Sequence, residues 1–170
     1  YSSALFETGQ ESLEKAQTLK YKSMVDQLGA QPGDHVLEIG CGWGGFAEYA
    51  AKERGLKVTG LTISKEQYDY AVDRMERTGV ADKVDIKLQD YRDETGLYDG
   101  IASIEMFEAV GEKYWPVYFE TLKNRLKPGK NATLQIITVE DHRFERYRKS
   151  VDFVQKYIFP GGMLPSPSVL

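Results

Sequence analysis

A cluster of glycines follows a short apolar run in the first third of the chain. Gly40, Gly42, Gly44 and Gly45 lie within six residues, directly after the run at positions 35–39. Glycine lets the backbone turn sharply, and it lets a ligand approach main-chain N–H groups that a Cβ atom would shield. We therefore expect this loop to bind a cofactor at the point where a strand gives way to a helix.

The identity of the cofactor depends on the residues around the loop. Gly40, Gly42 and Gly45 satisfy the G-x-G-x-x-G spacing of dinucleotide-binding proteins, so a nicotinamide cofactor is one reading. Glu38 favours S-adenosylmethionine, because its carboxylate could reach the cationic amino-acid end of that cofactor directly or through water. Residues 61–64 carry no Asp or Glu to hold ribose hydroxyls, as a nicotinamide dinucleotide requires. The balance favours S-adenosylmethionine.

Two further acids follow apolar runs later in the chain. Asp90 comes after the run at 84–88, where the adenine of a cofactor would lie, although a turn-forming or capping Asp is an equal alternative. Glu108 follows the run at 98–104, and a doubly wound sheet binds ligands at the carboxyl ends of its strands. The simpler alternative for Glu108 is a surface glutamate near a helix start. We expect no metal ligands.

The elements that must position these residues alternate along the chain. Strand-like and helical stretches of this kind, joined in order, predict βαβ units and a doubly wound α/β domain with a mainly parallel sheet. We expect strands at 35–39, 57–61, 84–88, 98–104 and 132–139, helices at 10–28, 46–54, 65–78 and 113–126, and two short helices on either side of Ser150.

The bulk composition excludes several classes of protein. A net charge of −4 argues against a general nucleic-acid binder, although residues 120–149 carry eight basic and four acidic side chains. Cys41 is the one cysteine, and no apolar run is long enough to cross a bilayer. These features predict a cytoplasmic protein of one domain. Basic residues at 143–149 beside aromatic residues at 153–159 suggest peripheral contact with the inner membrane surface.

At these residues the chain resembles the cyclopropane-fatty-acyl-phospholipid synthases and their mycolic-acid relatives, which methylate unsaturated acyl chains with S-adenosylmethionine. The matching stretches run in order through nearly the whole chain: 1–3, 36–45, 60–64, 89–93, 103–108, 157–162 and 164–166. The glycine loop is generic, whereas Met106-Phe107-Glu108 and the Ile-Phe-Pro-Gly-Gly segment at 158–162 are specific. The resemblance implies a Rossmann-like class I methyltransferase fold whose C-terminal part is missing from the chain.

The resemblance also implies roles for individual residues and segments. Residues 1–30 would cover the cofactor, 35–139 would form the nucleotide-binding βαβ units, and 140–170 would begin the lipid-substrate region of a single domain, 1–170. Gln67 would hold the ribose in place of the missing carboxylate. The resemblance implies cofactor contacts from Tyr1, Ser2, Gly40, Gly42, Thr62, Gln67, Tyr91 and Arg92. The full cofactor-binding set that we expect adds Glu38, Gly44, Ser64 and Asp90.

The catalytic set implied by the resemblance departs from the family pattern. Glu108 matches a glutamate that helps to hold a bicarbonate ion, thought to act as base, and the backbone at Ile104 belongs to the same site. The family's cysteine and histidine in that site are replaced here by Ser3 and Gln135. Neither replacement supplies a titratable imidazole. The identity of the base is therefore left open, and the expected product is a cyclopropane or a methyl- or methylene-branched chain.

Other readings remain beside this one. The expected partners are unsaturated phospholipid acyl chains and a membrane surface, with no nucleic acid and with a homodimer as an option. Tyr114, Trp115, Tyr157 and Phe159 are candidate walls of the acyl site, although such residues more often form plain core. The alternatives are a methyltransferase of small metabolites, a catalytically inactive cofactor-binding module and a nicotinamide oxidoreductase.

Overall fold

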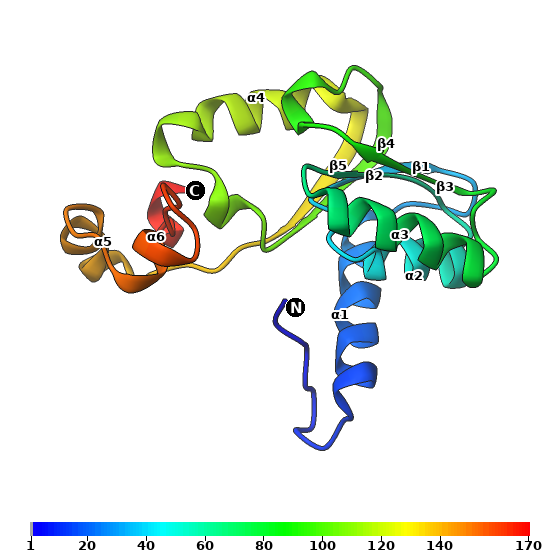
Figure 1. The fold of residues 1–170 in the computed structure, drawn as a ribbon, viewed down its shortest axis with the longest axis horizontal. Helices are drawn as coiled ribbons and strands as arrows, with labels where there is room; N and C mark the ends of the chain where they lie inside the picture. The colour runs from blue at the N-terminus through cyan, green and yellow to red at the C-terminus, as the bar shows by residue number, and fades with distance from the viewer. Residues whose placement is uncertain (1) are drawn as a thin grey trace.

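The fold is a five-stranded parallel sheet with helices on both faces. A computed structural model describes residues 2–170, and its strands lie in the order β3-β2-β1-β4-β5 (Figure 1). The elements are α1 (Leu13–Leu28), β1 (His35–Ile39), α2 (Gly45–Arg54), β2 (Lys57–Thr62), α3 (Lys65–Arg77), β3 (Val84–Leu88), β4 (Tyr98–Ile104), α4 (Trp115–Arg125), β5 (Leu126–Gln135), α5 (Asp141–Arg148) and α6 (Phe153–Tyr157). The predicted doubly wound α/β architecture is confirmed.

Short-range signals in the sequence set most element boundaries. Helix α1 begins after Ser12, whose side chain accepts a hydrogen bond from the backbone of Lys15, and it ends at Gly29 in the left-handed conformation (φ 68°). Helix α3 begins after Ser64, whose hydroxyl accepts from the backbone N–H of Gln67. The predicted bounds of β1, β3 and β4 agree with the structure, and each strand carries buried apolar residues between flanking turns.

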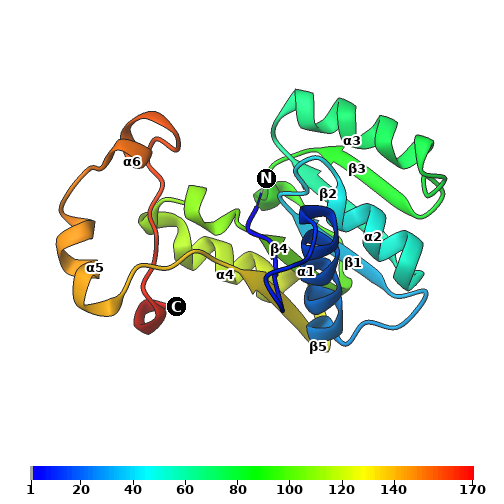
Figure 2. The same ribbon diagram turned by 90° about the horizontal axis from the view of Figure 1, so that it is seen from below.

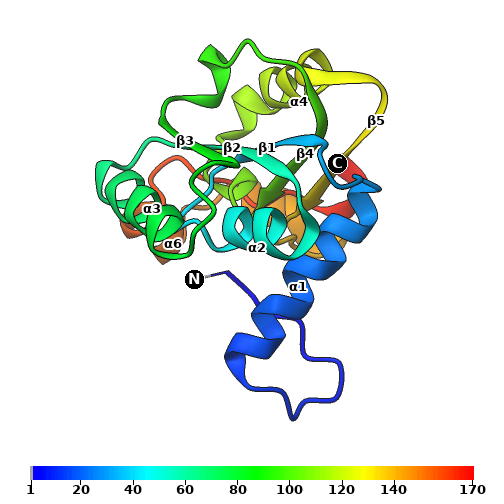
Figure 3. The same ribbon diagram turned by 90° about the vertical axis from the view of Figure 1, so that its right-hand side faces the viewer.

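The two faces of the sheet carry separate apolar cores. One core contains Val36 of β1 and Ala102 of β4, and helices α1, α2 and α3 cover it. The other contains Leu37 of β1 and Ile101 of β4, and α4 covers it (Figure 3). Neighbouring residues along β1 thus enter opposite cores, as the alternation of a strand requires. Both faces of the central strands are buried, and in β1 every residue from Val36 to Ile39 is buried, Glu38 included.

Two predicted boundaries on the C-terminal side are wrong. The expected strand at 132–139 is observed as Leu126–Gln135, and its pairing with β4 ends where Gln135 meets Ile104. After Gln135 the chain leaves the sheet, and the backbone N–H of Ile137 donates to the side chain of Glu108 instead of to a neighbouring strand. The helix expected at 113–126 is a 3-10 turn, Glu112–Tyr114, followed by α4, with Pro116 in its first turn.

The two ends of the chain return to the same edge of the sheet. Residues 2–12 run beside α1, held by a hydrogen bond of 3.1 Å from the Leu5 N–H to the Ala16 carbonyl, and lead back toward β4 (Figure 2). At the other end, α5 and α6 extend away from the sheet before the chain comes back past Glu108. Among residues 2–170, no helix is long and apolar enough to cross a bilayer.

Candidate functional site

The candidate site lies along the edge where the parallel strands end. Strand order reverses between β1 and β4, and a doubly wound sheet binds its ligand in the crevice expected at this point of the edge. Residues from the ends of all five strands meet along it, together with the N-terminal segment. The predicted residues brought to this edge are Ser2, Ser3, Glu38, Gly40, Gly42, Gly44, Thr62, Gln67, Asp90, Tyr91, Arg92, Ile104, Glu108 and Gln135. Tyr1 lies outside the described residues.

The three glycines of the loop after β1 are needed for different reasons. All have positive φ, and a Cβ atom on Gly40 would lie 2.6 Å from the Met106 side chain. A Cβ on Gly44 would lie 2.9 Å from Met75 of α3, so this glycine serves packing. Gly42 (φ 53°) faces open space. Gly42 is therefore the position where the backbone is bare toward a ligand.

Glu38 is a buried carboxylate below this loop. Its side chain lies on the face covered by α1 and α2, with the small residues Gly60 and Ala102 beside it in register. Burial raises its pKa well above the usual value, against the opposing effects of the Ala47 N–H and of the Lys20 charge. Its Oε2 atom is buried and has no hydrogen-bond partner within residues 2–170. An unpartnered buried carboxylate oxygen fits a cationic ligand group.

Lys20 is a site residue that the sequence reasoning missed. It is only 4% exposed, and its ammonium group donates a hydrogen bond to the Ser2 hydroxyl. Burial lowers its pKa, while the charges of Glu105 and Glu38 act in the opposite direction. The signal was present in the sequence, because Lys20 falls between Ala16 and Met24 at helical spacing on the buried stripe of α1. A lysine in that stripe calls for anionic partners.

The end of β2 presents a hydrogen-bonded pair. The Thr62 hydroxyl donates to the Gln67 side-chain carbonyl over 2.8 Å, and the Ser64 N–H donates to the same hydroxyl. Ser64 itself caps α3, so its hydroxyl is used by the helix. Gln67 thus lies at the first turn of α3 with its amide NH₂ available to donate a hydrogen bond to a partner oxygen. That position suits a ribose hydroxyl, as the resemblance implies.

The end of β3 carries an ion pair. Asp90 caps the short 3-10 turn Tyr91–Asp93 and accepts two hydrogen bonds from the guanidinium of Arg92, at 2.9 and 2.6 Å. The hydrogen bonds from Arg92 are the main cause of the lowered pKa of Asp90, as expected for a paired carboxylate. Tyr91 packs edge-on against Tyr118 of α4, with ring centroids 5.6 Å apart. The capping alternative for Asp90 is confirmed, and its cofactor role stays a prediction.

Glu108 lies beyond the end of β4 in a closely packed corner. Its Oε1 atom accepts from the backbone N–H of Ile137, and its Oε2 atom is buried without a hydrogen-bond partner in the described chain. Burial raises its pKa. The returning segment approaches so closely that a Cβ on Gly162 would lie 2.6 Å from the Glu108 carbonyl oxygen. The surface alternative for Glu108 is wrong, since its exposed fraction is 8%.

A second glutamate, Glu105, links Ser3 and Gln135, and the sequence reasoning missed it as a site residue. Its Oε1 atom accepts hydrogen bonds from the Ser3 backbone N–H at 2.8 Å and from the Gln135 side-chain amide at 2.7 Å. The pairing of Ile104 with Gln135 in the sheet sets this arrangement. Glu105 therefore ties the N-terminal segment to the ends of β4 and β5.

A small cavity of about 90 Å³ opens beside Glu108. Its lining comes from Glu108 and from the α5–α6 region: Tyr147, Asp152, Gln155, Phe159, Gly162, Met163 and Leu164. Of the four candidate aromatic walls, Phe159 lines this cavity. Trp115 is buried in the core under α4, and Tyr114 and Tyr157 are exposed.

A parallel α/β sheet with a bare glycine loop after β1 and a buried acid beneath it defines a domain of the nucleotide-cofactor-binding class. Comparison with known proteins makes the assignment specific. The model of the mycolic acid cyclopropane synthetase family matches residues 1–170. The chain belongs to this family.

Individual relatives agree with the family assignment. The chain is 44% identical to tuberculostearic acid methyltransferase UfaA1 of Mycobacterium tuberculosis, over 93% of this chain and 37% of that protein. It is 41% identical to cyclopropane-fatty-acyl-phospholipid synthase of Escherichia coli, over 92% of this chain and 39% of that protein. Mycolic acid cyclopropane synthase CmaA1, solved with SAH and CTAB, superposes with a TM-score of 0.86 at 30% identity, over 98% of this chain and 61% of that one. The chain thus spans well under half the length of these two sequence relatives.

The burial of Glu38 generates a prediction about pH and stability. In the ligand-free whole protein, Glu38 keeps its proton above about pH 4.3, where the unfolded chain loses it. Stability should therefore fall as pH rises from that value through the folded pKa, at up to roughly 1.4 kcal/mol per pH unit. Glu38→Gln should remove this loss and stabilise the protein at pH 8. Urea denaturation at pH 5 and pH 8 measures both effects.

The same variant should weaken S-adenosylmethionine binding, measured by calorimetry, by roughly tenfold or more, because a charged hydrogen bond is lost. Glu53→Gln, an exposed change on α2, is the control and should alter neither property. A Glu38→Gln protein that is less stable at pH 8, or that binds the cofactor like the wild type, contradicts this account of Glu38.

Proposed function

We propose that this chain forms the cofactor-binding part of an S-adenosylmethionine-dependent methyltransferase acting on the double bond of an unsaturated phospholipid acyl chain. The observation that carries the proposal is the buried, unpartnered oxygen of Glu38 below the bare backbone of Gly42. That pair suits a ligand with a cationic amino-acid end. The ends of β2 and β3 then offer Gln67 to the ribose and the Asp90–Arg92 region to the adenine.

The substrate side of the proposal depends on the carboxylates after β4. S-adenosylmethionine supplies an electrophilic methyl group when bound. Attack by an alkene forms a carbon–carbon bond and leaves a positive charge on the acyl chain. Glu105 and Glu108 lie at the adjoining strand end, where negative charge stabilises such a cation and a base can remove a proton from it. The aromatic ring of Phe159, beside Glu108, offers a further cation-stabilising face.

The relatives support the lipid substrate class. Their names describe a tuberculostearic acid methyltransferase and a cyclopropane-fatty-acyl-phospholipid synthase, at 44% and 41% identity. These two names differ in product, so both a methyl- or methylene-branched chain and a cyclopropane are compatible with the same core. In all these products the acyl chain gains one carbon from the cofactor.

The direct test is mass spectrometry of acyl chains. The whole protein, incubated with S-adenosylmethionine and phospholipids bearing cis-monounsaturated chains, should add the mass of one CH₂ group to the released fatty acids. Fragmentation then separates a ring from a branch. If the cofactor binds and no mass is gained, the lipid proposal fails and a small-metabolite substrate or an inactive module replaces it.

A matched pair of glycine variants tests the cofactor site. Gly42 (φ 53°) and Gly79 (φ 72°) both have positive φ and open space where a Cβ would be placed. Alanine at either position should cost roughly 1–2 kcal/mol of backbone strain. Gly42→Ala should in addition weaken S-adenosylmethionine binding at least tenfold by calorimetry, whereas Gly79→Ala, at the distant end of α3, should not. Equal affinities for the two variants would remove Gly42 from the site.

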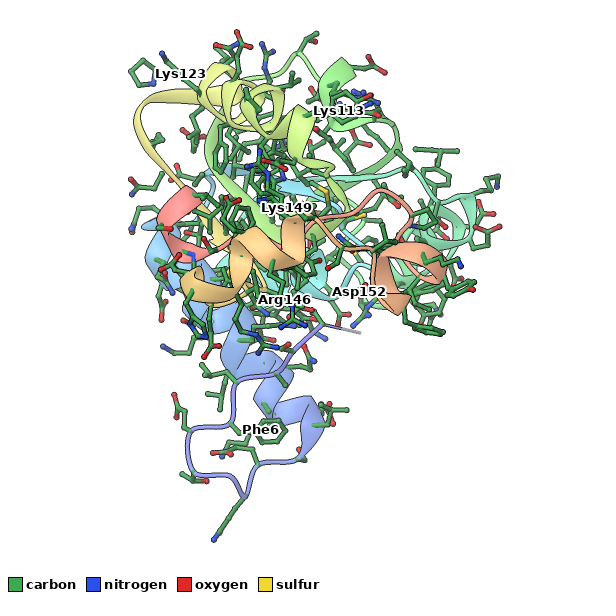
Figure 4. All side chains as sticks on the ribbon, turned by 90° about the vertical axis from the view of Figure 1, so that its left-hand side faces the viewer. Phe6, Lys113, Lys123, Arg146, Lys149 and Asp152 are labelled. Atoms are coloured by element: carbon green, nitrogen blue, oxygen red, sulfur yellow. The ribbon has the colours of Figure 1, made fainter. Side chains whose placement is uncertain are left out.

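We also propose that the α5–α6 region meets a lipid surface. Val151, Phe153 and Tyr157 are 74%, 68% and 61% exposed. Figure 4 shows Arg146 of the neighbouring α5 and Lys149, which directly follows that helix. The basic character is weaker than the sequence indicates, because Arg148 pairs with Glu112 at 2.6 Å. The exposed apolar side chains therefore supply the main attraction.

Sedimentation with anionic phospholipid vesicles tests this contact. Replacing Phe153 and Tyr157 by Ser should reduce the bound fraction of the whole protein several-fold, because the apolar area that enters the interface is lost. Leu97→Ser, at an exposed position away from this region, is the control and should sediment like the wild type. Unchanged sedimentation of the double variant would refute the lipid contact.

A further inference from the structure

Glu105 occupies a backbone conformation that a side chain seldom adopts. Its φ is 49°, and it is the one non-glycine residue with positive φ in the described part of the chain. A left-handed conformation costs roughly 1–2 kcal/mol for a residue with a Cβ atom. Strain of this kind persists where surrounding contacts enforce it, and it is concentrated at functional sites. Here the β4–β5 pairing enforces it, because the Glu105 N–H donates to the Gln135 carbonyl at 2.8 Å.

The strained backbone directs a carboxylate toward two donors from distant parts of the chain. Oε1 of Glu105 accepts from the Ser3 N–H, 102 residues away, and from the Gln135 amide, 30 residues away. The buried ammonium of Lys20 is near enough for the charge of Glu105 to favour its protonated form. No hydrogen bond to Oε2 of Glu105 is found within residues 2–170. One oxygen is thus anchored, and the other remains available to a reactant.

A separate bicarbonate ion does not fit this arrangement. Ser3 and Gln135 occupy the positions that the family resemblance assigns to the anion, and the Ser3 backbone N–H and the Gln135 side-chain amide already donate to Glu105. An anion beside them would share its donors with a carboxylate and would lie against like charge, which is unfavourable. Glu108 adds to this conflict, since its Oε2 atom is buried and the negative charge of Glu105 raises the pKa of Glu108 in addition to the larger effect of burial.

We propose that Glu105 is itself the catalytic base, taking the place of a bound bicarbonate ion. This inference rests on the proposed function. The alkene electron pair forms a bond to the methyl carbon while the carbon–sulfur bond breaks, giving S-adenosylhomocysteine and a carbocation on the acyl chain. A C–H bond of the transferred methyl group then breaks. Its proton passes to Oε2 of Glu105, and its electron pair closes a cyclopropane or, after a hydride shift along the chain, forms a methylene double bond.

Two substitutions at Glu105 separate basicity from positioning. Glu105→Gln keeps an oxygen that can accept from Ser3 and Gln135, and it removes the base. We expect its kcat to fall roughly 100-fold or more, with the dissociation constant of S-adenosylmethionine within about threefold of the wild type. Glu105→Gly relieves the left-handed strain, so it should fold, and its lost activity should be partly restored by added formate or bicarbonate. Glu53→Gln, exposed on α2, is the control and should keep full activity.

The wild type supplies the decisive comparison. Its rate of acyl methylation should be the same in carbon dioxide-free buffer and with added bicarbonate. A rate that requires bicarbonate, or a Glu105→Gln protein with an unchanged kcat, overturns the assignment of the base. Absence of any acyl methylation by the wild type instead overturns the proposed function.

A binding measurement keeps the two proposals apart. Carbon-13 NMR with labelled bicarbonate should show binding to Glu105→Gly and none to the wild type, whether or not lipid is methylated. Binding to the wild type overturns the inference independently of activity.

Discussion

The parallel pairing of β1 with both β2 and β4 is the constraint on which the rest of the structure depends. Val36 of β1 lies opposite Val58 on one side and Gly100 on the other, so all strands end at one edge. The order of the strands reverses between β1 and β4, and doubly wound sheets bind their ligands at this point of the strand-end edge. Helices on both faces bury these strands and fix the edge. Without that register, Gly42, Glu38 and Glu105 would not share one crevice.

The crevice is arranged to favour positive charge. Three carboxylates approach it, one from β1 and two from the segment after β4: Glu38 is buried, Glu105 is anchored by two donors, and Glu108 is held by one backbone N–H. Lys20 is the buried cation that faces two of them. Such a site carries an unfavourable burial energy when no ligand is bound, which a cationic cofactor and a cationic transition state would relieve. The burial of these carboxylates thus lowers the free energy of unfolding of the ligand-free protein, and the residues responsible are those proposed to act.

The sequence predicts the elements well and the site only in part. Local signals determine the ends of elements: Ser64 caps the start of α3, and Gly29 ends α1. The glycine loop indicates the edge of the sheet at which a ligand is expected. Glu105 gave no local signal, because its importance comes from the sheet register and from Ser3, 102 residues away. The predicted end of β5 at position 139 was wrong for a related reason. The Ile137 N–H donates to the side chain of Glu108, which follows β4. Long-range partners of this kind cannot be read from local composition.

A crystal structure of the whole protein, grown with S-adenosylhomocysteine and bicarbonate, tests the central claim most directly. The account predicts the amino-acid end of the cofactor at Glu38, its chain across Gly42 and its sulfur facing the carboxylates after β4. It also predicts that Glu105 stays bonded to Ser3 and Gln135, with no anion between them. A cofactor bound elsewhere, or a bicarbonate ion on Ser3 and Gln135 with Glu105 turned away, would contradict the account.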